Sequence, residues 1–246
     1  MKNKTEFYQE LLHKFTQLAK EHNLLGENIT VSGKTLSDEE ALGNPERRDY
    51  PLLTGKESLM EACFHNGRGQ AFTDQPGPFE GSLSHIIDHA LESNHSRAVF
   101  IAALNAVTSH LKLSDKTIHC RNEEPEACAG ELSRCLEEKH GKVKIALVGY
   151  QPAMLEKLKD SFPIRVLDLD ADKIGTIRYG IEVEHGIEKR EEVLQWSDII
   201  LCTGSTIANG TLPDYLGEKP VYFFGTTIAG TAELMGLNRL CFKAAS

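Results

Sequence analysis

The sequence lacks the features that mark membrane and exported proteins. No run of about 18 apolar residues occurs, so no segment is long enough to cross a bilayer as a helix. Residues 1–15, MKNKTEFYQELLHKF, contain no continuous apolar stretch of the kind that signal peptides carry. The six cysteines are dispersed and include no C-x-x-C pair, a pattern typical of reduced thiols. We therefore expect a cytoplasmic protein with no membrane partner.

Several catalytic motifs and an excess of basic charge are also missing. The chain has no Walker loop, no G-x-S-x-G nucleophile turn and no H-E-x-x-H metal-binding helix. Lysine and arginine number 27 against 36 acidic residues, which gives a formal net charge of −9 at pH 7. Because phosphate backbones repel such a chain, nucleic acid is not an expected partner.

What is present indicates a globular protein in two parts. A length of 246 residues allows one large domain or two smaller ones. In residues 1–111, apolar spacing predicts a helix over 4–22, and NITVSGKTL reads as a strand. SLMEACFHNGRGQAFT predicts a hairpin that turns at Asn66-Gly67, and DQPGPFEG a loop. Helices over about 83–92 and 95–111 complete an α+β domain, the second of them apolar enough to be buried. Residues 112–141 are predicted to form a helical connector.

The pattern changes to a regular strand–helix alternation in residues 142–246. KVKIALVGY, IRVLDLD, SDIILCTG and KPVYFFG read as strands, with RLCF as a possible fifth. PAMLEKLKDSF, EKREEVLQW, TLPDYL and AGTAELMGL read as the helices that follow the four strands. Alternation with short loops predicts an α/β domain with a parallel sheet and helices on both faces.

Small polar residues gather where the predicted parallel strands end. Ligands of such sheets bind beyond the carboxyl ends of the strands, where backbone N–H groups and hydroxyls can hold them. An alternative is that these residues only form turns and helix caps, as Thr211 could do before LPDYL. The candidate ligand-binding residues are Gly149, Tyr150, Thr203, Gly204, Ser205, Thr206, Asn209, Thr211, Gly225, Thr226 and Thr227.

A nucleotide cofactor is the second kind of ligand that the same edge of the predicted parallel sheet could bind. A dinucleotide fingerprint would place three glycines after the first strand, but this turn has only Gly149. Asp168 ends the next strand, where an acidic residue can hold ribose hydroxyls. Half of the pattern is present, so NAD and S-adenosylmethionine stay open as alternative cofactors. Asp168 is the candidate residue that would bind either of them.

Three further groups of residues carry weaker signals. His85 and His89 are four apart, so on a helix they share one face, as two metal ligands do or as two solvated histidines do. Asp74 and Glu80 lie on the Pro/Gly loop, as binding carboxylates or as turn formers. The spacing of His119, Cys120, Cys128 and Cys135 is wider than that of structural zinc pairs, and Cys202 is a possible nucleophile without an identifiable base.

Three segments of the second half resemble the family called putative heavy-metal chelation proteins. They are KIALVGYQPAMLEKL, EEVLQWSDIILCTGSTIANGTLPDYL and KPVYFFGTTIAG, and the strand followed by TGST and NGTL carries the strongest likeness. The family usually has an N-terminal domain similar to that of enolase. ACFHNGRGQAFT followed by FIAALNAV resembles the hairpin and buried helix of that domain.

The resemblance implies a Rossmann-like domain preceded by an enolase-N-terminal-like domain, with a ligand site in the cleft between them. It further implies a homodimer whose second subunit completes the site. It carries the ligand-binding role over to the strand-end residues and adds Asn105 of the buried helix. The His85/His89 pair matches no motif of the family.

Three functions remain open at this point. The first is a protein that binds a metal chelate or small anionic metabolite between its domains, with a divalent metal ion or metal chelate as cofactor. The second is a transferase or oxidoreductase that uses NAD or S-adenosylmethionine. The third is a non-catalytic sensor in a metal-related pathway. No catalytic residue is identified, and the sequence does not decide whether the protein is an enzyme.

Overall fold

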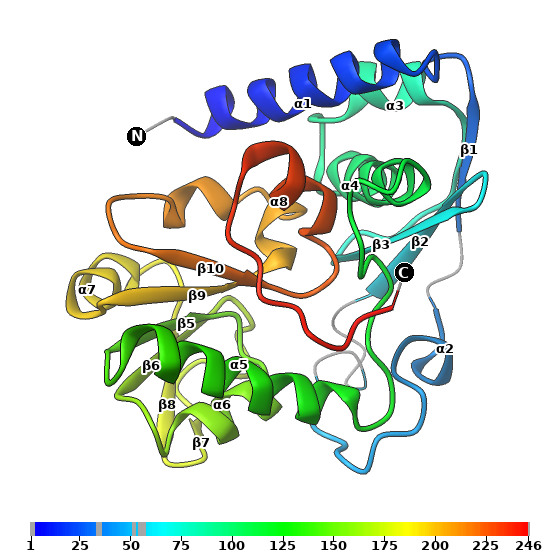
Figure 1. Ribbon diagram of the computed structural model, residues 1–246. Helices are drawn as coiled ribbons and strands as arrows, with labels where there is room; N and C mark the ends of the chain where they lie inside the picture. Colours follow the sequence, from blue (N-terminus) through cyan, green and yellow to red (C-terminus); the bar gives the residue numbers. More distant parts are fainter. Residues whose placement is uncertain (1–2, 33–35, 51–52, 54–57, 246) are drawn as a thin grey trace.

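The computed structural model describes residues 3–32, 36–50, 53 and 58–245, which build two β-sheets with helices packed between and around them (Figure 1). The predicted mixed α/β class is confirmed. Within these residues no helix combines the length and the apolar character needed to cross a membrane. The N-terminal elements are α1 (Lys4–Glu21), β1 (Asn28–Val31), α2 (Asp38–Leu42), β2 (Ser58–Phe64), β3 (Gly67–Thr73), β4 (Phe79–Ser82), α3 (Leu83–His89) and α4 (Asn94–His110).

The remaining elements follow a long helix, α5 (Glu124–His140), which fills the predicted connector. They are β5 (Ile145–Val148), α6 (Pro152–Leu158), β6 (Ile164–Asp168), β7 (Ile177–Arg178), β8 (Ile181–His185), α7 (Arg190–Trp196), β9 (Ile199–Thr203), the short 3₁₀ helices η2 (Gly204–Ile207) and η3 (Leu212–Tyr215), β10 (Val221–Phe224) and α8 (Ala229–Met235).

The first sheet is antiparallel, with strand order β3-β2-β1-β4. The predicted hairpin is present, but its turn differs from the expectation. Phe64 pairs with Gly67, so His65 and Asn66 form the turn and the positive φ, 50°, falls on His65. Gly67 lies instead in β3 against α4, where a Cβ would overlap the backbone of Ala106. The glycine is therefore needed for close packing, while the turn lies one residue earlier.

The predicted loop DQPGPFEG is wrong in its second half. Residues 79–82 form β4, an edge strand whose backbone pairs with β1, with Glu80 opposite Thr30. Pairing along the edge of the sheet outweighs the turn character of the two glycines and two prolines of DQPGPFEG. Glu80 is thus an exposed strand residue instead of a loop residue.

The second sheet has strand order β10-β9-β5-β6-β8-β7, parallel except for the edge strand β7. Residues of its strands alternate between two cores. Ala146 and Val148 of β5 face the core that contains α4 and α8, while Ile145 and Leu147 face the core that contains α5 and α6. Both faces are therefore covered, as the continuous apolar strands predict, and Figure 1 shows α5 and α6 on one side and α8 on the other.

Two details of this sheet were not predicted correctly. Strands β7 and β8 form an antiparallel pair between β6 and α7, in a stretch for which no strand was predicted. The possible fifth strand RLCF is wrong: in residues 239–242 only Arg239 bridges to Phe223, and the segment continues without forming a strand. Phe223 is already paired with β9 on its other side, so the segment contributes a single bridge.

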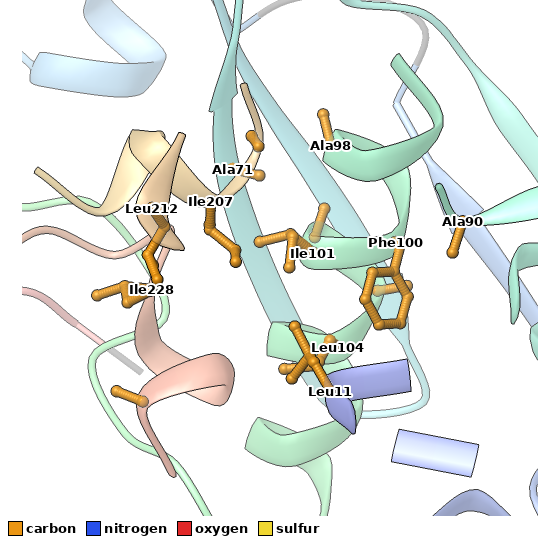
Figure 2. Close-up of a cluster of buried hydrophobic side chains, with 14 of the residues drawn as sticks. Leu11, Ala71, Ala90, Ala98, Phe100, Ile101, Leu104, Ile207, Leu212 and Ile228 are labelled. Atoms are coloured by element: carbon orange, nitrogen blue, oxygen red, sulfur yellow. The ribbon is translucent and has the colours of Figure 1, made fainter. Parts of the chain in front are cut away.

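Helix α4 occupies the centre of the molecule, and its buried position is confirmed. Every residue from Ala98 to Thr108 is buried. One side packs on β2 and β3, and another side meets α8, where a Cβ on Gly230 would overlap Leu104 and Thr108. Figure 2 shows Ile101 reaching toward Ile207 of the C-terminal part.

Asn105 is the polar centre of this helix. Its amide nitrogen donates to the carbonyl oxygens of Gln70, Thr226 and Thr227 at 2.9, 3.3 and 3.1 Å. Its amide oxygen accepts from the backbone N–H of Gly230 at 2.8 Å. One fully buried side chain thus connects β3, the loop after β10 and α8.

Replacing Asn105 by alanine is expected to lower the free energy of unfolding by about 3 kcal/mol, because several buried backbone groups lose their partner. Urea unfolding followed by circular dichroism measures the change. Asn28→Ala, at an exposed position in β1, is the matched control and should change stability by less than about 0.5 kcal/mol. Equal effects of the two substitutions would contradict the bridging role of Asn105.

Candidate functional site

A cavity of about 190 Å³ opens at the carboxyl edge of the parallel sheet. β5 is the strand at which the order of the sheet reverses, with β6 on one side and β9 on the other. Ligands of open α/β sheets bind at such a reversal point. The cavity walls include the ends of β5 and β9, and the N-terminal part contributes Leu42, Tyr50 and Phe72.

The structure brings most of the predicted site residues to this cavity and leaves five outside. Asn105 is not at its wall, because its amide is engaged with backbone groups in the core. Asp74, Glu80, His85 and His89 are exposed and do not line it. The predicted residues that line the cavity are Gly149, Tyr150, Asp168, Thr203, Gly204, Ser205, Thr206, Asn209, Thr211, Gly225, Thr226 and Thr227.

Many of the strand-end side chains are engaged with one another. The Thr206 hydroxyl donates to the carbonyl oxygen of Thr203 at 2.7 Å, and the Thr211 hydroxyl donates to Oδ1 of Asn209 at 2.7 Å. Oγ1 of Thr227 accepts from the backbone N–H of Phe72 at 3.0 Å. Thr211 makes no side-chain cap to η3. Hydrogen bonds within the chain therefore account for part of the hydroxyl cluster. The polar groups that have no such bond are the ones available to a ligand.

Three buried polar atoms at the cavity have no hydrogen-bond partner among the described residues. They are the phenol oxygen of Tyr150, Oγ1 of Thr226 and Nδ1 of His119. The side chains of Tyr150 and Thr226 are only 5% and 1% exposed. Buried polar groups are nearly always paired, so three unpaired atoms at one cavity indicate polar contacts that the chain alone does not supply.

The titration states of these groups suit hydrogen bonding by neutral side chains. Burial raises the pKa of the Tyr150 phenol above its ordinary value, so the group stays a neutral O–H donor. Burial lowers the pKa of His119, which keeps its ring neutral at neutral pH. The sequence pointed to both residues, Tyr150 as a candidate ligand contact and His119 for metal binding.

Gly149 and Asp168, the two residues that suggested a nucleotide site, have structural roles. Gly149 has φ +86° and a Cβ there would lie 2.5 Å from Cγ2 of Thr203, so backbone geometry and packing account for this glycine. The carboxylate of Asp168 accepts from the backbone N–H of Tyr150 at 2.6 Å and from that of Asp170 at 2.8 Å. Both oxygens of Asp168 therefore hold the loops of the sheet edge.

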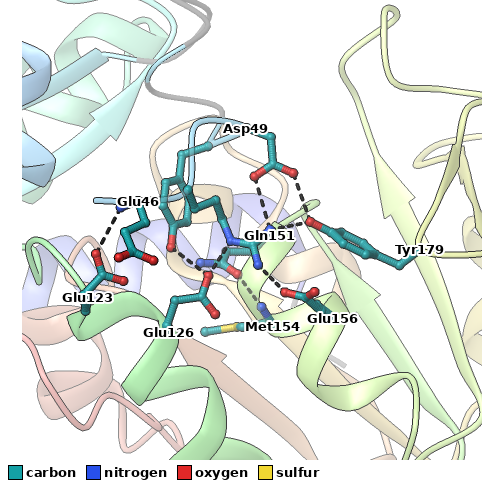
Figure 3. Close-up of polar contacts among 10 residues, drawn as sticks. Glu46, Asp49, Glu123, Glu126, Gln151, Met154, Glu156 and Tyr179 are labelled. Atoms are coloured by element: carbon teal, nitrogen blue, oxygen red, sulfur yellow. Dashed lines mark hydrogen bonds and ion pairs between the residues drawn. The ribbon is translucent and has the colours of Figure 1, made fainter. Parts of the chain in front are cut away.

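An arginine network fixes the wall that the N-terminal part supplies. Arg47 donates to the carboxylates of Glu126 in α5 and Glu156 in α6 and to the Tyr179 hydroxyl. Figure 3 shows these three acceptors converging from separate elements. The Tyr179 hydroxyl donates to Asp49 at 3.0 Å, which returns the network to the segment that carries Tyr50.

Three cysteines also line the cavity: Cys120, Cys128 and Cys241. The neighbouring Cys128 thiol, together with the nearby cations of Arg239 and Lys116, lowers the pKa of Cys241 below its ordinary value. Burial instead raises the pKa of Cys120 to about 12. Sequence reasoning gave no signal for Cys241, because its partner is far away in the chain.

The other sulfur and histidine candidates are not at this place. Cys202 is fully buried and does not line the cavity, and burial raises its pKa to about 12, so the proposed nucleophile is not supported. The rings of His85 and His89 are 4.7 Å apart, but His89 bonds to Glu92. In the described ranges no group of three or more His, Cys, Asp and Glu side chains is placed to hold a metal ion.

Arg47→Lys is expected to cost about 1–2 kcal/mol of unfolding free energy, because an ammonium group cannot serve acceptors on three elements at once. Urea unfolding measures the loss. Arg48→Lys is the matched control, since Arg48 is exposed and, among the described residues, its hydrogen bond is to Asn44. If the two substitutions have the same effect, the network does not hold the wall in place.

The lowered pKa of His119 predicts a pH dependence of stability. In the folded state the ring resists protonation, whereas in the unfolded chain it takes up a proton near its ordinary pKa of about 6.5. Stability attributable to His119 is therefore complete above that pH and falls by up to about 1 kcal/mol as the pH is lowered from about 7.5 to 5.5. Thermal unfolding should show a smaller pH-induced loss in His119→Gln. His13→Gln, at an exposed position, should follow the parent; a parent-like His119→Gln would refute the assignment.

Comparison with known proteins places the chain as follows. The model of the DUF364 family, described as "Putative heavy-metal chelation", matches residues 132–230. Among curated proteins, none matches. A crystal structure of a protein of unknown function from the DUF364 family, from Pyrococcus horikoshii, is similar with a TM-score of 0.54 and 17% identity, over 88% of this chain and 79% of that one.

A second solved structure, also of a protein of unknown function from the DUF364 family and from Desulfitobacterium hafniense, has a TM-score of 0.48 and 14% identity. It covers 74% of this chain and 72% of that one. At 17% identity the Pyrococcus horikoshii structure speaks for the fold alone. The match of residues 132–230 confirms the resemblance seen in the sequence: this segment carries the pattern of DUF364, the family described as "Putative heavy-metal chelation".

Proposed function

We propose that the chain binds a small molecule in the cavity at the reversal point of the parallel sheet. The observation that carries the proposal is the set of three unpaired buried atoms on Tyr150, Thr226 and His119. A ligand with polar atoms at matching positions would complete their hydrogen bonds. Such a ligand recovers the free energy that the chain loses by burying these groups unpaired.

The lining favours a ligand with an apolar body and little net charge. Aromatic and aliphatic side chains, among them Tyr50, Phe72 and Met154, form much of the wall. The charged lining residues are Asp168, which is bonded to backbone N–H groups, and Lys173, which is paired with Asp170 at 3.1 Å. Of the two ligand classes expected from sequence, this composition supports an organic metal chelate over a small anionic metabolite.

The family description supports the same choice, because a chelate presents an organic surface to the protein while the metal stays bound to the chelator. The proposal covers binding and does not include a reaction. A nucleotide cofactor is less favoured, since Asp168 is already engaged with the backbone on both oxygens. A sensor role in a metal-related pathway would use the same binding step.

The finer expectations from sequence belong to this proposal. They are the division into domains at 1–111, 112–141 and 142–246, the Rossmann-like and enolase-N-terminal-like character of the parts, the homodimer and the cytoplasmic location. The role of the strand-end residues as ligand contacts is also part of it. None of these is needed for the binding experiment that follows.

The test uses the neutral complexes of nickel(II) and cobalt(II) with two 8-hydroxyquinolinate ligands, the free chelator, NAD and S-adenosylmethionine as probes in thermal-shift and calorimetric titrations. A probe present at 100 times its dissociation constant stabilises the fold by about 2.7 kcal/mol. We expect a shift with the complexes and none with the nucleotides. A shift with NAD or S-adenosylmethionine instead would replace this proposal by the nucleotide alternative, and no shift with any probe would count against it.

Tyr150→Phe and Thr226→Val are expected to weaken probe binding about 5- to 10-fold each, since each removes one hydrogen bond to the ligand. Neither removes a hydrogen bond from the free protein, so the melting temperature should stay level or rise. Thr231→Val is the matched control, because Oγ1 of Thr231 is also buried and unpaired but does not line the cavity. Loss of affinity in Thr231→Val equal to that in Thr226→Val would show that the hydroxyls do not contact the probe.

A further inference from the structure

One segment of the N-terminal part, residues 42–50, has a cavity-wall residue at each of its ends. Leu42 and Tyr50 both line the cavity, and they are only 2% and 4% exposed. The residues between them, 43–49, form no helix or strand, and of these only Pro45 is buried. We call residues 42–50 the strap. Because both of its ends are wall residues, a movement of the strap changes how far the cavity is open.

Hydrogen bonds to the start of α5 hold the first half of the strap. The backbone N–H of Asn44 donates to Oδ1 of Asn122 at 2.9 Å, and that of Glu46 donates to Oε1 of Glu123 at 3.0 Å. The backbone N–H of Asn122 donates to the carbonyl oxygen of Leu42 at 2.6 Å. Asn44, Glu46, Asn122 and Glu123 are all exposed, so water competes for these bonds.

Arg47 holds the second half of the strap by charge. Its guanidinium donates to the carboxylates of Glu126 in α5 and Glu156 in α6. Figure 3 shows the carboxylates of Glu126 and Glu156 approaching the strap from these two helices. The side chain of Arg47 is 16% exposed, and those of Glu126 and Glu156 are 22% and 39% exposed. Ion pairs that water reaches in this way contribute little stability, and salt weakens them.

The strap therefore differs from the rest of the cavity wall. Helix α5 and the strands of the parallel sheet carry buried apolar side chains, whereas the strap between its ends is held by exposed hydrogen bonds and one arginine. Segments with few buried contacts open at a lower free-energy cost than that of unfolding the whole molecule. Gly43, with φ +70°, follows α2 directly and provides a position at which the backbone of the strap can turn.

We propose that the strap is a gate of the cavity. Release of Arg47 from Glu126 and Glu156 lets the strap leave α5 and α6, and the cavity then opens to solvent on that side while both sheets stay folded. Ionic strength sets the balance between the closed and open states, since salt screens the pairs that hold the strap in place. The inference rests on the proposed function for the molecule that passes the gate, whereas the opening is a property of the chain itself.

Cysteine labelling measures the opening without any ligand. Cys128 is 5% exposed, lies in α5 and lines the cavity, so an alkylating reagent reaches it when the strap is open. Cys202 is fully buried and does not line the cavity, so its labelling reports unfolding of the whole molecule. Cys63 is exposed and reports the reactivity of the reagent. Pulses of iodoacetamide followed by quantitative peptide mass spectrometry give the three rates in one sample.

Cys128 of the parent should be labelled at least about 10-fold faster than Cys202, because the strap opens more often than the molecule unfolds. Arg47→Ala is expected to raise the Cys128 rate about 5- to 10-fold and to leave the Cys63 rate unchanged, since it removes both ion pairs. Arg48→Ala is the matched control, because Arg48 also lies in the strap but is exposed. Equal Cys128 rates in the two variants, or a Cys128 rate equal to that of Cys202, would overturn the proposal.

A change of salt concentration repeats the test on the parent chain, which guards against a variant that fails to fold. Raising sodium chloride from about 10 mM to 1 M shortens the Debye length from about 30 Å to 3 Å, and the Cys128 rate should rise about 3-fold. A Cys128 rate that stays level, or that rises only in step with that of Cys202, would also overturn the proposal. Because the labelling uses no ligand, its failure leaves the proposed binding function standing, and failure of the probe titrations leaves the gate standing.

Discussion

Helix α4 is enclosed on two sides so closely that a single Cβ would not fit. Gly67 and Gly69 of β3 lie against the backbone of Ala106, and Gly230 of α8 lies against Leu104 and Thr108. At this depth a polar group must be fully paired, and Asn105 meets the requirement by bonding to backbone groups on both sides. The antiparallel sheet and the parallel sheet are thereby held in a fixed position relative to each other.

The cavity results from this fixed position of the two sheets. Its floor is the carboxyl edge of the parallel sheet, and its opposite wall is formed by side chains that reach it only because β3 and the segment around Tyr50 are held nearby. Asn105 and Arg47 fix this wall from two directions, one through backbone carbonyls and the other through carboxylates of α5 and α6. The unpaired Tyr150 and Thr226 hydroxyls are then left facing a space that the chain itself does not fill.

Sequence reasoning worked where one element carries its own signal. The continuous apolar strands and the apolar α4 were recognisable because burial on all sides leaves a local pattern, and the strand ends followed from chain order in a parallel sheet. It missed whatever depends on partners far away in the chain. β4 was not recognised because it contains Gly81 and follows Pro78, and only its pairing with β1 makes it a strand. Cys241, Tyr50 and Phe72 carried no mark of a site, and the Asn105 motif proved to be a connection between layers, outside the cavity.

Helix α1, the first helix, packs against α8, which comes after the strands of both sheets, and this contact bears on the order in which the fold forms. The Tyr8 hydroxyl of α1 donates to the carbonyl oxygen of Ile207 at 2.6 Å, and Lys14 donates to that of Leu234 at 2.9 Å. Figure 1 shows α1 lying beside α8, the last helix. The apolar face of α1 meets α4 early, through Phe15 and Phe100, whereas its contacts with α8 have to wait until α8 has been synthesised. The contacts between α1 and α8 therefore form after the strands of both sheets have been synthesised.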